Sequence, residues 1–156
     1  MGDYTALLEE LLKDEQELQF TEFTNKTAVQ IGMSIVEKAI EQDSPMVILI
    51  QKNGQELFYS KLDGATMDND LWVARKNNVV DHFSHSSYYM NTLFRSTQTT
   101  IESYFLERKD FGVEPGAFPI IVRNVGIVGT ITVSGVPGEG EDHFIITSAL
   151  REYFGK

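Results

Sequence analysis

The stretch from Gly116 to His143 constrains the fold of this chain more than any other part of the sequence. It reads GAFPIIVRNVGIVGTITVSGVPGEGEDH. Two segments rich in β-branched residues flank the tight turn Asn124-Val125-Gly126, a pattern typical of a β-hairpin. A glycine-rich loop follows, and the acidic residues after it are typical of a helix start. The stretch therefore predicts strand, turn, strand, loop and helix in that order.

A second hairpin is predicted upstream. Met46–Ile50 is a continuous apolar run, as expected of a strand covered on both faces. Asn53-Gly54 is the strongest short hairpin signal, and Gln55–Ser60 returns as the second strand. Because hairpins join antiparallel strands, the chain cannot form a parallel doubly wound sheet. Gln19–Glu22 is predicted as a further short strand.

The remaining segments are predicted to be helical. Asp3 can cap a first helix, and Thr24 or Asn25 can cap a second one that ends near Asp43 and is apolar enough to pack on a sheet. Further helices are expected to start near Thr66 or Asp68, at Ser84, Ser86 or Ser87, at Thr99 or Thr100, and at Glu141, the last one running to Phe154. The order of elements predicts an α+β protein, one domain over residues 1–156, with helices on both faces of an antiparallel sheet of about five strands.

Composition restricts the chemistry and the partners. The chain has 156 residues and no cysteine, which excludes disulfides, thiolate metal sites and a cysteine nucleophile. Its net charge of −10 disfavours nucleic acid. The acidic N-terminal segment is unlike a secretory signal, and no apolar run approaches the ~20 residues of a membrane span. We therefore expect a cytoplasmic protein that does not bind membranes.

Two groups of motifs resemble a known family. The first comprises GAFPI, VGTITVSG and the EDH before the last helix, and the second comprises Asn69, Leu71-Trp72, Arg75-Lys76, Val80, Phe83 and Ser86-Ser87. Together they resemble the haem-degrading-like domain family, which includes the glycolate-utilisation G protein and extracellular haem-binding sensor proteins, and most closely its cytosolic branch. The resemblance implies a three-layer α/β/α sandwich, symmetric homo-oligomers and haem as a candidate cofactor.

Trp72, Arg75 and Lys76 form the most suggestive cluster of candidate ligand-binding residues. Spacings of three and four residues place both cations beside the indole on one helix surface. Such a group could hold a carboxylate, either of a small organic acid or of a haem propionate. In the alternative interpretation, Trp72 belongs to the core and Arg75 pairs with an acid such as Asp70 or one from another subunit.

The histidines allow several interpretations. His82 and His85 could supply two metal ligands with Asp81 or Asp110 as a third, but the spacing matches no zinc signature, so we assign no metal site. Any of His82, His85 and His143 could serve as an axial haem ligand.

Ser86, Ser87, Asp142 and His143 are the remaining polar candidates. No nucleophile elbow of the GxSxG type surrounds a serine, and Ser86 is predicted to cap a helix. Asp142 complements the dipole of the last helix and can cap its free N–H groups, whereas His143 is expected to be neutral and hydrogen-bonded. Asp142-His143 as an acid/base pair is an open alternative.

Glycines and the aromatic-proline element suggest a pocket. Gly129 lies within a strand and leaves room for another backbone or a flat ligand, with Phe118-Pro119 as one wall. The full set of candidate ligand-binding residues is Trp72, Arg75, Lys76, His85, Ser86, Ser87, Gly116, Phe118, Pro119, Asp142 and His143.

The sequence predicts a homo-oligomeric small-molecule-binding domain whose ligand is haem or a small anionic metabolite. Two alternatives remain. One is an interaction scaffold that uses the acidic N-terminal helix, and the other is a histidine-dependent enzyme, with or without a metal. We rank the enzyme last, because each catalytic constellation considered lacks a member.

Overall fold

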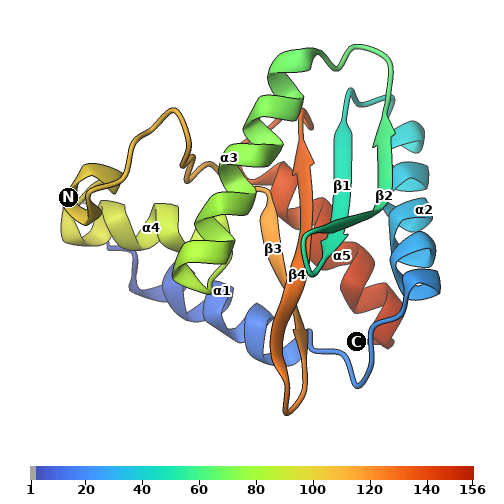
Figure 1. The fold of residues 1–156 in the computed structure, drawn as a ribbon, viewed down its shortest axis with the longest axis horizontal. Helices are drawn as coiled ribbons and strands as arrows, with labels where there is room; N and C mark the ends of the chain where they lie inside the picture. The colour runs from blue at the N-terminus through green and yellow to red at the C-terminus, as the bar shows by residue number, and fades with distance from the viewer. Residues whose placement is uncertain (1–2) are drawn as a thin grey trace.

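The computed structural model describes residues 3–156, which form five α-helices, one 3-10 helix and four β-strands (Figure 1). In chain order they are α1 (Thr5–Glu17), α2 (Asn25–Glu41), β1 (Val47–Lys52), β2 (Gln55–Lys61), α3 (Met67–Phe83), α4 (Ser87–Thr97), the 3-10 helix η1 (Ile101–Tyr104), β3 (Ala117–Val122), β4 (Gly126–Ser134) and α5 (Glu141–Phe154). No helix in this part of the chain is both long and apolar enough to cross a lipid bilayer.

The two predicted hairpins form one sheet. Its strand order is β2-β1-β4-β3, and each neighbouring pair is antiparallel. The β1–β2 turn has positive φ at Asn53 and Gly54, and Asn124 and Gly126 have positive φ at the β3–β4 turn. Asparagine and glycine tolerate this left-handed backbone, so both turns form where the sequence predicts them.

The expected strand Gln19–Glu22 does not form, and the sheet has four strands rather than about five. Phe20 alone joins the edge of β3, through a single parallel bridge to Val122. The Phe20 ring is 1% exposed and packs edge-on against Phe23 and Phe154, each with ring centroids 4.9 Å apart. The segment between α1 and α2 therefore contributes an apolar side chain to the core. Gln19, Thr21 and Glu22 do not extend the pairing with β3.

The two faces of the sheet differ in polarity, and helices cover both of them (Figure 1). On one face, Ile131 and Val133 of β4 belong to the main apolar core, to which α2 and α5 contribute. On the other face, Thr132 donates a hydrogen bond to Asn77 of α3, and Asn69 donates one to Ser134 over 3.1 Å. This polar face beneath α3 is where polar side chains come close enough to form sites.

A smaller apolar cluster of Val79, Met90, Phe94 and Ile101 joins α3 to α4 and η1. The predicted caps hold these helices in place. Thr66 is the N-cap of α3, and the Ser86 hydroxyl accepts the Tyr89 N–H at the start of α4. The start of α4 is thereby fixed beside β3 and α5.

Candidate functional site

Trp72 and Arg75 anchor a surface loop. The Arg75 guanidinium lies 5.0 Å from the centre of the Trp72 ring, and its Nε donates to the Lys109 carbonyl over 3.1 Å. Gly112 packs flat on the indole, since a Cβ there would lie 2.6 Å from the ring. The expected pairing of Arg75 with Asp70 is wrong, because Asp70 instead binds Tyr59 and Lys61. This anchoring fits the structural alternative rather than a ligand cleft.

Lys76 separates from that pair and points into the fold. The residue is 2% exposed, and its Nζ donates to the Val133 carbonyl over 2.9 Å and to Asp142 Oδ2 over 3.1 Å. Burial lowers the pKa of Lys76, and the Asp142 carboxylate opposes that shift. Gly116 has φ of +136°, and a Cβ there would lie 2.7 Å from the Lys76 Nζ. The start of β3 therefore needs glycine in order to admit the lysine.

Asp142 does not cap α5. The N-cap position is Gly140, and Asp142 Oδ1 accepts the Val136 N–H over 2.8 Å. With its other oxygen bound to Lys76, the carboxylate closes the glycine-rich loop onto α3. The expected capping role is wrong because the lysine and the loop N–H engage both oxygens.

Ser86 and Ser87 are structural. Ser86 caps α4 as predicted. The Ser87 hydroxyl accepts the Ala117 N–H over 3.0 Å, which ties the start of α4 to β3. Both residues are fully buried, so neither hydroxyl is presented to solvent.

His85 pairs with a buried carboxylate of α1. Its Nδ1 lies 2.9 Å from Glu15 Oε1, and Glu15 Oε2 accepts the Ser86 N–H over 3.1 Å. The hydrogen bond to Glu15 raises the pKa of His85 against the opposing effect of burial. His85 therefore fastens α1 to the start of α4.

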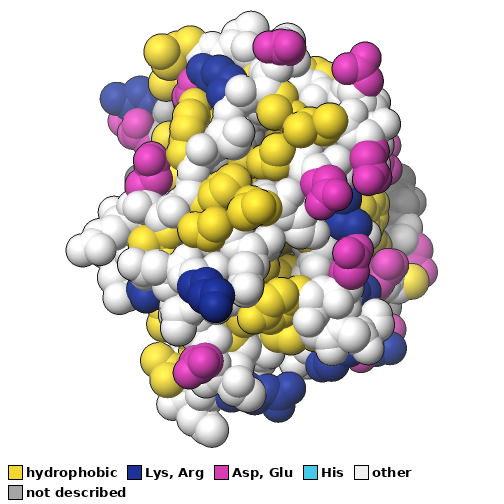
Figure 2. Space-filling model, turned by 90° about the vertical axis from the view of Figure 1, so that its right-hand side faces the viewer, with side chains coloured by type: hydrophobic (Ala, Val, Ile, Leu, Met, Phe, Trp, Pro, Cys, Tyr) yellow, Lys and Arg dark blue, Asp and Glu magenta, His cyan; other side chains and the backbone are white. Residues whose placement is uncertain are grey.

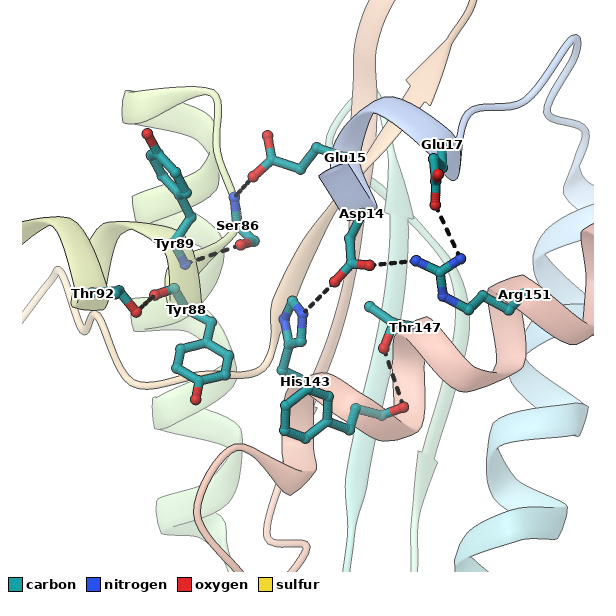
Figure 3. Close-up of polar contacts among 11 residues, drawn as sticks. Asp14, Glu15, Glu17, Ser86, Tyr88, Tyr89, Thr92, His143, Thr147 and Arg151 are labelled. Atoms are coloured by element: carbon teal, nitrogen blue, oxygen red, sulfur yellow. Dashed lines mark hydrogen bonds and ion pairs between the residues drawn. The ribbon is translucent and has the colours of Figure 1, made fainter. Parts of the chain in front are cut away.

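His143 is fully enclosed. Its ring meets three aromatic rings edge-on, those of Tyr88, Phe118 and Phe144. Its Nε2 lies 3.6 Å from Asp14 Oδ2, the contact drawn as a dashed line in Figure 3, which is within range of an ion pair but too long for a hydrogen bond. Within residues 3–156, neither ring nitrogen has a hydrogen-bond partner. The expected hydrogen bond is therefore wrong.

Asp14 of α1 contacts two residues of α5, His143 and Arg151. Its Oδ1 accepts from Arg151 over 2.5 Å, and Arg151 also binds Glu17 over 3.2 Å (Figure 3). Burial alone raises the pKa of the Asp14 carboxyl, but His143 and Arg151 outweigh burial and hold that pKa below its ordinary value. The acid beside His143 thus has its charge satisfied by Arg151.

The expected pocket between Gly129 and Phe118-Pro119 does not form, although Gly129 lines a different hollow beside Gln51. A Cβ at Gly129 would lie 1.9 Å from the Gln51 carbonyl oxygen, so the neighbouring strand β1 occupies that space. Phe118 is fully buried in the apolar core, and Pro119 is also buried. Of the two uses predicted for Gly129, the structure therefore has the close approach of another backbone.

A cleft of about 160 Å³ opens where α4 faces the start of α5. One wall is a face of α4 with Tyr88, Asn91 and Arg95. The opposite wall comprises Glu114, Pro115, Gly138, Glu139, Gly140 and Asp142. Asp142 is the one sequence-predicted residue that lines the cleft, while Lys76 and His143 lie behind its wall.

The three α4 side chains in the cleft are polar and unengaged. Asn91 is only 8% exposed, yet within the described chain its amide makes no hydrogen bond, and the same holds for the Arg95 guanidinium and the Tyr88 hydroxyl. Burial and the nearby Glu139 carboxylate raise the pKa of Tyr88. These residues were not predicted, although their spacing of three and four along a helix could have indicated a shared polar face.

The cleft offers hydrogen-bond donors on one side and carboxylates on the other. Arg95 presents a planar fork suited to a carboxylate, and the Asn91 amide and Tyr88 hydroxyl add donors beside it. Glu114 and Glu139 can accept from a hydroxyl or an ammonium group. The arrangement fits a small molecule that has both kinds of group.

Three known proteins are similar over most of their length. The UPF0303 protein SCO2848 of Streptomyces coelicolor is 40% identical over 148 residues, 94% of this chain and 93% of the relative. The crystal structure of the yeast Ybr137w protein superposes with a TM-score of 0.87 at 31% identity, covering 95% of this chain and 87% of that one. The PduOC:heme complex shares the fold at a TM-score of 0.65 and 17% identity, over 84% of this chain and 93% of that one.

Residues 23–151 match the family described as haem degrading protein HbpS-like. That match covers most of the sequence and agrees with the resemblance carried by the strand and helix motifs. The chain belongs to the HbpS-like family.

Proposed function

We propose that this protein binds a small polar molecule bearing a carboxylate, in the cleft between α4 and α5. The observation that carries the proposal is the polar face of α4, where Tyr88, Asn91 and Arg95 line a cleft without hydrogen bonds to the described residues. Their polar groups are therefore available to bond a molecule in the cleft.

The dimensions and charges of the cleft limit the ligand. Its volume of about 160 Å³ lies below the ~300 Å³ at which pockets for larger ligands begin. Arg95 would pair with the ligand carboxylate, and Glu114 and Glu139 would accept from a hydroxyl or amine at its other end. A hydroxy acid or an amino acid meets both demands.

Haem is the other candidate, because the family description and the PduOC:heme complex both name it. Haem iron needs an axial ligand, most often histidine. In residues 3–156, His143 is enclosed by aromatic rings, His85 is bound to Glu15, and His82 packs against Phe83 and Phe111. No histidine lines the cleft. The α4–α5 cleft therefore offers haem no histidine ligand, and we assign haem no role in this cleft.

The proposal is tested by calorimetric titration and thermal unfolding with lactate, alanine and succinate. We expect at least one of these acids to raise the unfolding temperature, as a ligand of the native state must. Arg95→Ala should weaken its binding about tenfold or more, because a charge-assisted hydrogen bond contributes about 1.5–3 kcal/mol. Asn91→Asp should act in the same direction by placing a like charge beside the carboxylate.

Arg108→Ala is the matched control. Arg108 is also an exposed guanidinium, but it pairs with Glu102 on the surface and does not line the cleft. Binding that Arg95→Ala leaves unchanged, or that Arg108→Ala weakens equally, would contradict the proposed site. Stoichiometric haemin binding with a shifted Soret band, abolished by replacing one histidine, would instead establish a haem site.

A further inference from the structure

The charges that line the α4–α5 cleft are unequal in number. Among the described residues, Arg95 is the one cation that lines it, whereas Glu114, Glu139 and Asp142 contribute carboxylates. Asp142 has both oxygens engaged, one by the Lys76 ammonium and the other by a backbone N–H. Within residues 3–156, the cleft therefore has one unpaired guanidinium and two unpaired carboxylates, those of Glu114 and Glu139.

Tyr88 lies within reach of both signs of charge. Burial raises the pKa of its hydroxyl, the Glu139 carboxylate raises that pKa further, and the Arg95 guanidinium acts in the opposite direction. The Tyr88 hydroxyl therefore stays protonated near neutral pH and is a neutral hydrogen-bond donor. The carboxylate of one wall and the cation of the other act across the same small space, so a molecule in the cleft meets both.

Asn91 supplies an independent indication of a ligand in this space. The residue lines the cleft and is only 8% exposed, yet its amide makes no hydrogen bond to residues 3–156. Asn77, which is 5% exposed beneath α3, instead has its amide bonded to Thr132 and Gln51. Because an amide carries both donors and an acceptor, Asn91 can donate to a carboxylate and accept from an ammonium group.

The balance of charge distinguishes among the acids that the cleft could hold. A hydroxy acid is a net anion at neutral pH, and a dicarboxylic acid carries still more negative charge, so each adds to the excess of carboxylates. An amino acid has no net charge, and its ammonium group can pair with Glu114 or Glu139 while its carboxylate pairs with Arg95. A hydroxyl in place of the ammonium group forms a weaker hydrogen bond to a carboxylate.

We propose that the ligand of the α4–α5 cleft is a small α-amino acid, bound as the zwitterion. This inference rests on the proposed function and decides between the two classes of acid that it allows. Arg95 and the Asn91 amide hold the carboxylate, and Glu114 and Glu139 hold the ammonium group at the opposite wall. The volume of about 160 Å³ favours a side chain as short as that of alanine or serine.

The test is calorimetric titration with alanine, lactate and propionate, which differ only in the group on Cα: ammonium, hydroxyl or hydrogen. We expect alanine to bind about tenfold more tightly than lactate, and propionate to bind most weakly, because only the ammonium group forms a charge-assisted pair with a carboxylate. Glu114→Gln combined with Glu139→Gln should remove the preference for alanine. Glu37→Gln combined with Glu41→Gln removes two exposed acids of α2 outside the cleft, and should change alanine binding less than about twofold.

The outcomes separate this inference from the proposed function. Glu114 and Glu139 are both exposed, so their double variant should unfold at the wild-type temperature without ligand. Lactate binding as tight as alanine binding, with Arg95→Ala weakening both, would overturn the amino-acid inference and leave the proposed function standing. Alanine binding that survives the loss of both glutamates would overturn the inference as well. If neither these acids nor succinate binds, the proposed function fails with it.

Discussion

At the scale of single residues, the ion pair of Lys76 and Asp142 is the most consequential contact. It joins α3 to the loop before α5 and forms the back of the α4–α5 cleft. Lys76 is almost fully buried, whereas the Asp142 side chain is 18% exposed. A buried charge that loses its partner destabilises a protein far more than the absence of both charges does.

Asp142→Asn should therefore lower the free energy of unfolding by about 3–5 kcal/mol, because the buried Lys76 ammonium is left without its counter-charge. The double variant with Lys76→Met should recover part of that loss, since no buried charge remains and the neutral amide oxygen still accepts the Val136 N–H. Urea denaturation of the two single variants and the double variant measures the coupling. Strictly additive losses would contradict the assigned ion pair.

At the scale of elements, α1 uses its acids inside the fold. Asp14 and Glu15 are both buried. Asp14 contacts His143 and Arg151 (Figure 3), and Glu15 contacts His85. The sequence left open an interaction scaffold that uses this acidic N-terminal helix. Because two of its acids bind α4 and α5, α1 is a structural part of the fold, and removing it would leave their partners unpaired.

The Glu15–His85 pair makes the docking of α1 depend on pH. Glu15 raises the pKa of His85 above the ordinary 6.5, so the stabilisation is fully present below that pH and is lost as the pH rises through the folded pKa. His85→Gln should therefore cost more stability at about pH 6 than at about pH 9. Urea denaturation at both values checks this expectation. An equal cost at both would show that the charge of His85 does not contribute.

At the scale of the whole molecule, the outer face of α2 is unusually apolar. Val29 is 39% exposed, Met33 60% and Ile40 61%. Figure 2 shows hydrophobic side chains running across this side of the molecule. The homo-oligomer expected from the family resemblance stays a prediction, and exposed apolar area of this kind is where a contact between copies would form.

Met33→Glu combined with Ile40→Glu should reduce the mass of any homo-oligomer, because both side chains are exposed and a charge at a buried contact is costly. Light scattering coupled to size-exclusion chromatography measures the mass. Val125→Glu, 71% exposed at the β3–β4 turn, is the control and should leave the mass unchanged. A monomeric wild type would make the oligomer prediction wrong, and an unaffected oligomer would place the contact elsewhere.

The sequence by itself determined the two hairpins, the caps at Thr66 and Ser86, and the family. These features depend on neighbouring residues: Asn53-Gly54 adopts its turn, and Ser86 accepts the Tyr89 N–H, whatever lies elsewhere in the chain. The strand at Gln19–Glu22 did not form, because only Phe20, whose ring is buried in the core, pairs with the edge of β3.

Only the tertiary structure decided which polar side chains share a site. Trp72, Arg75 and Lys76 are close in sequence, yet Arg75 reaches the Lys109 loop and Lys76 reaches Asp142. Asn91 and Arg95 came into the cleft because helix α4 packs opposite a loop some forty residues away. Such contacts depend on the relative positions of distant elements, which packing of the whole core sets and no local pattern encodes.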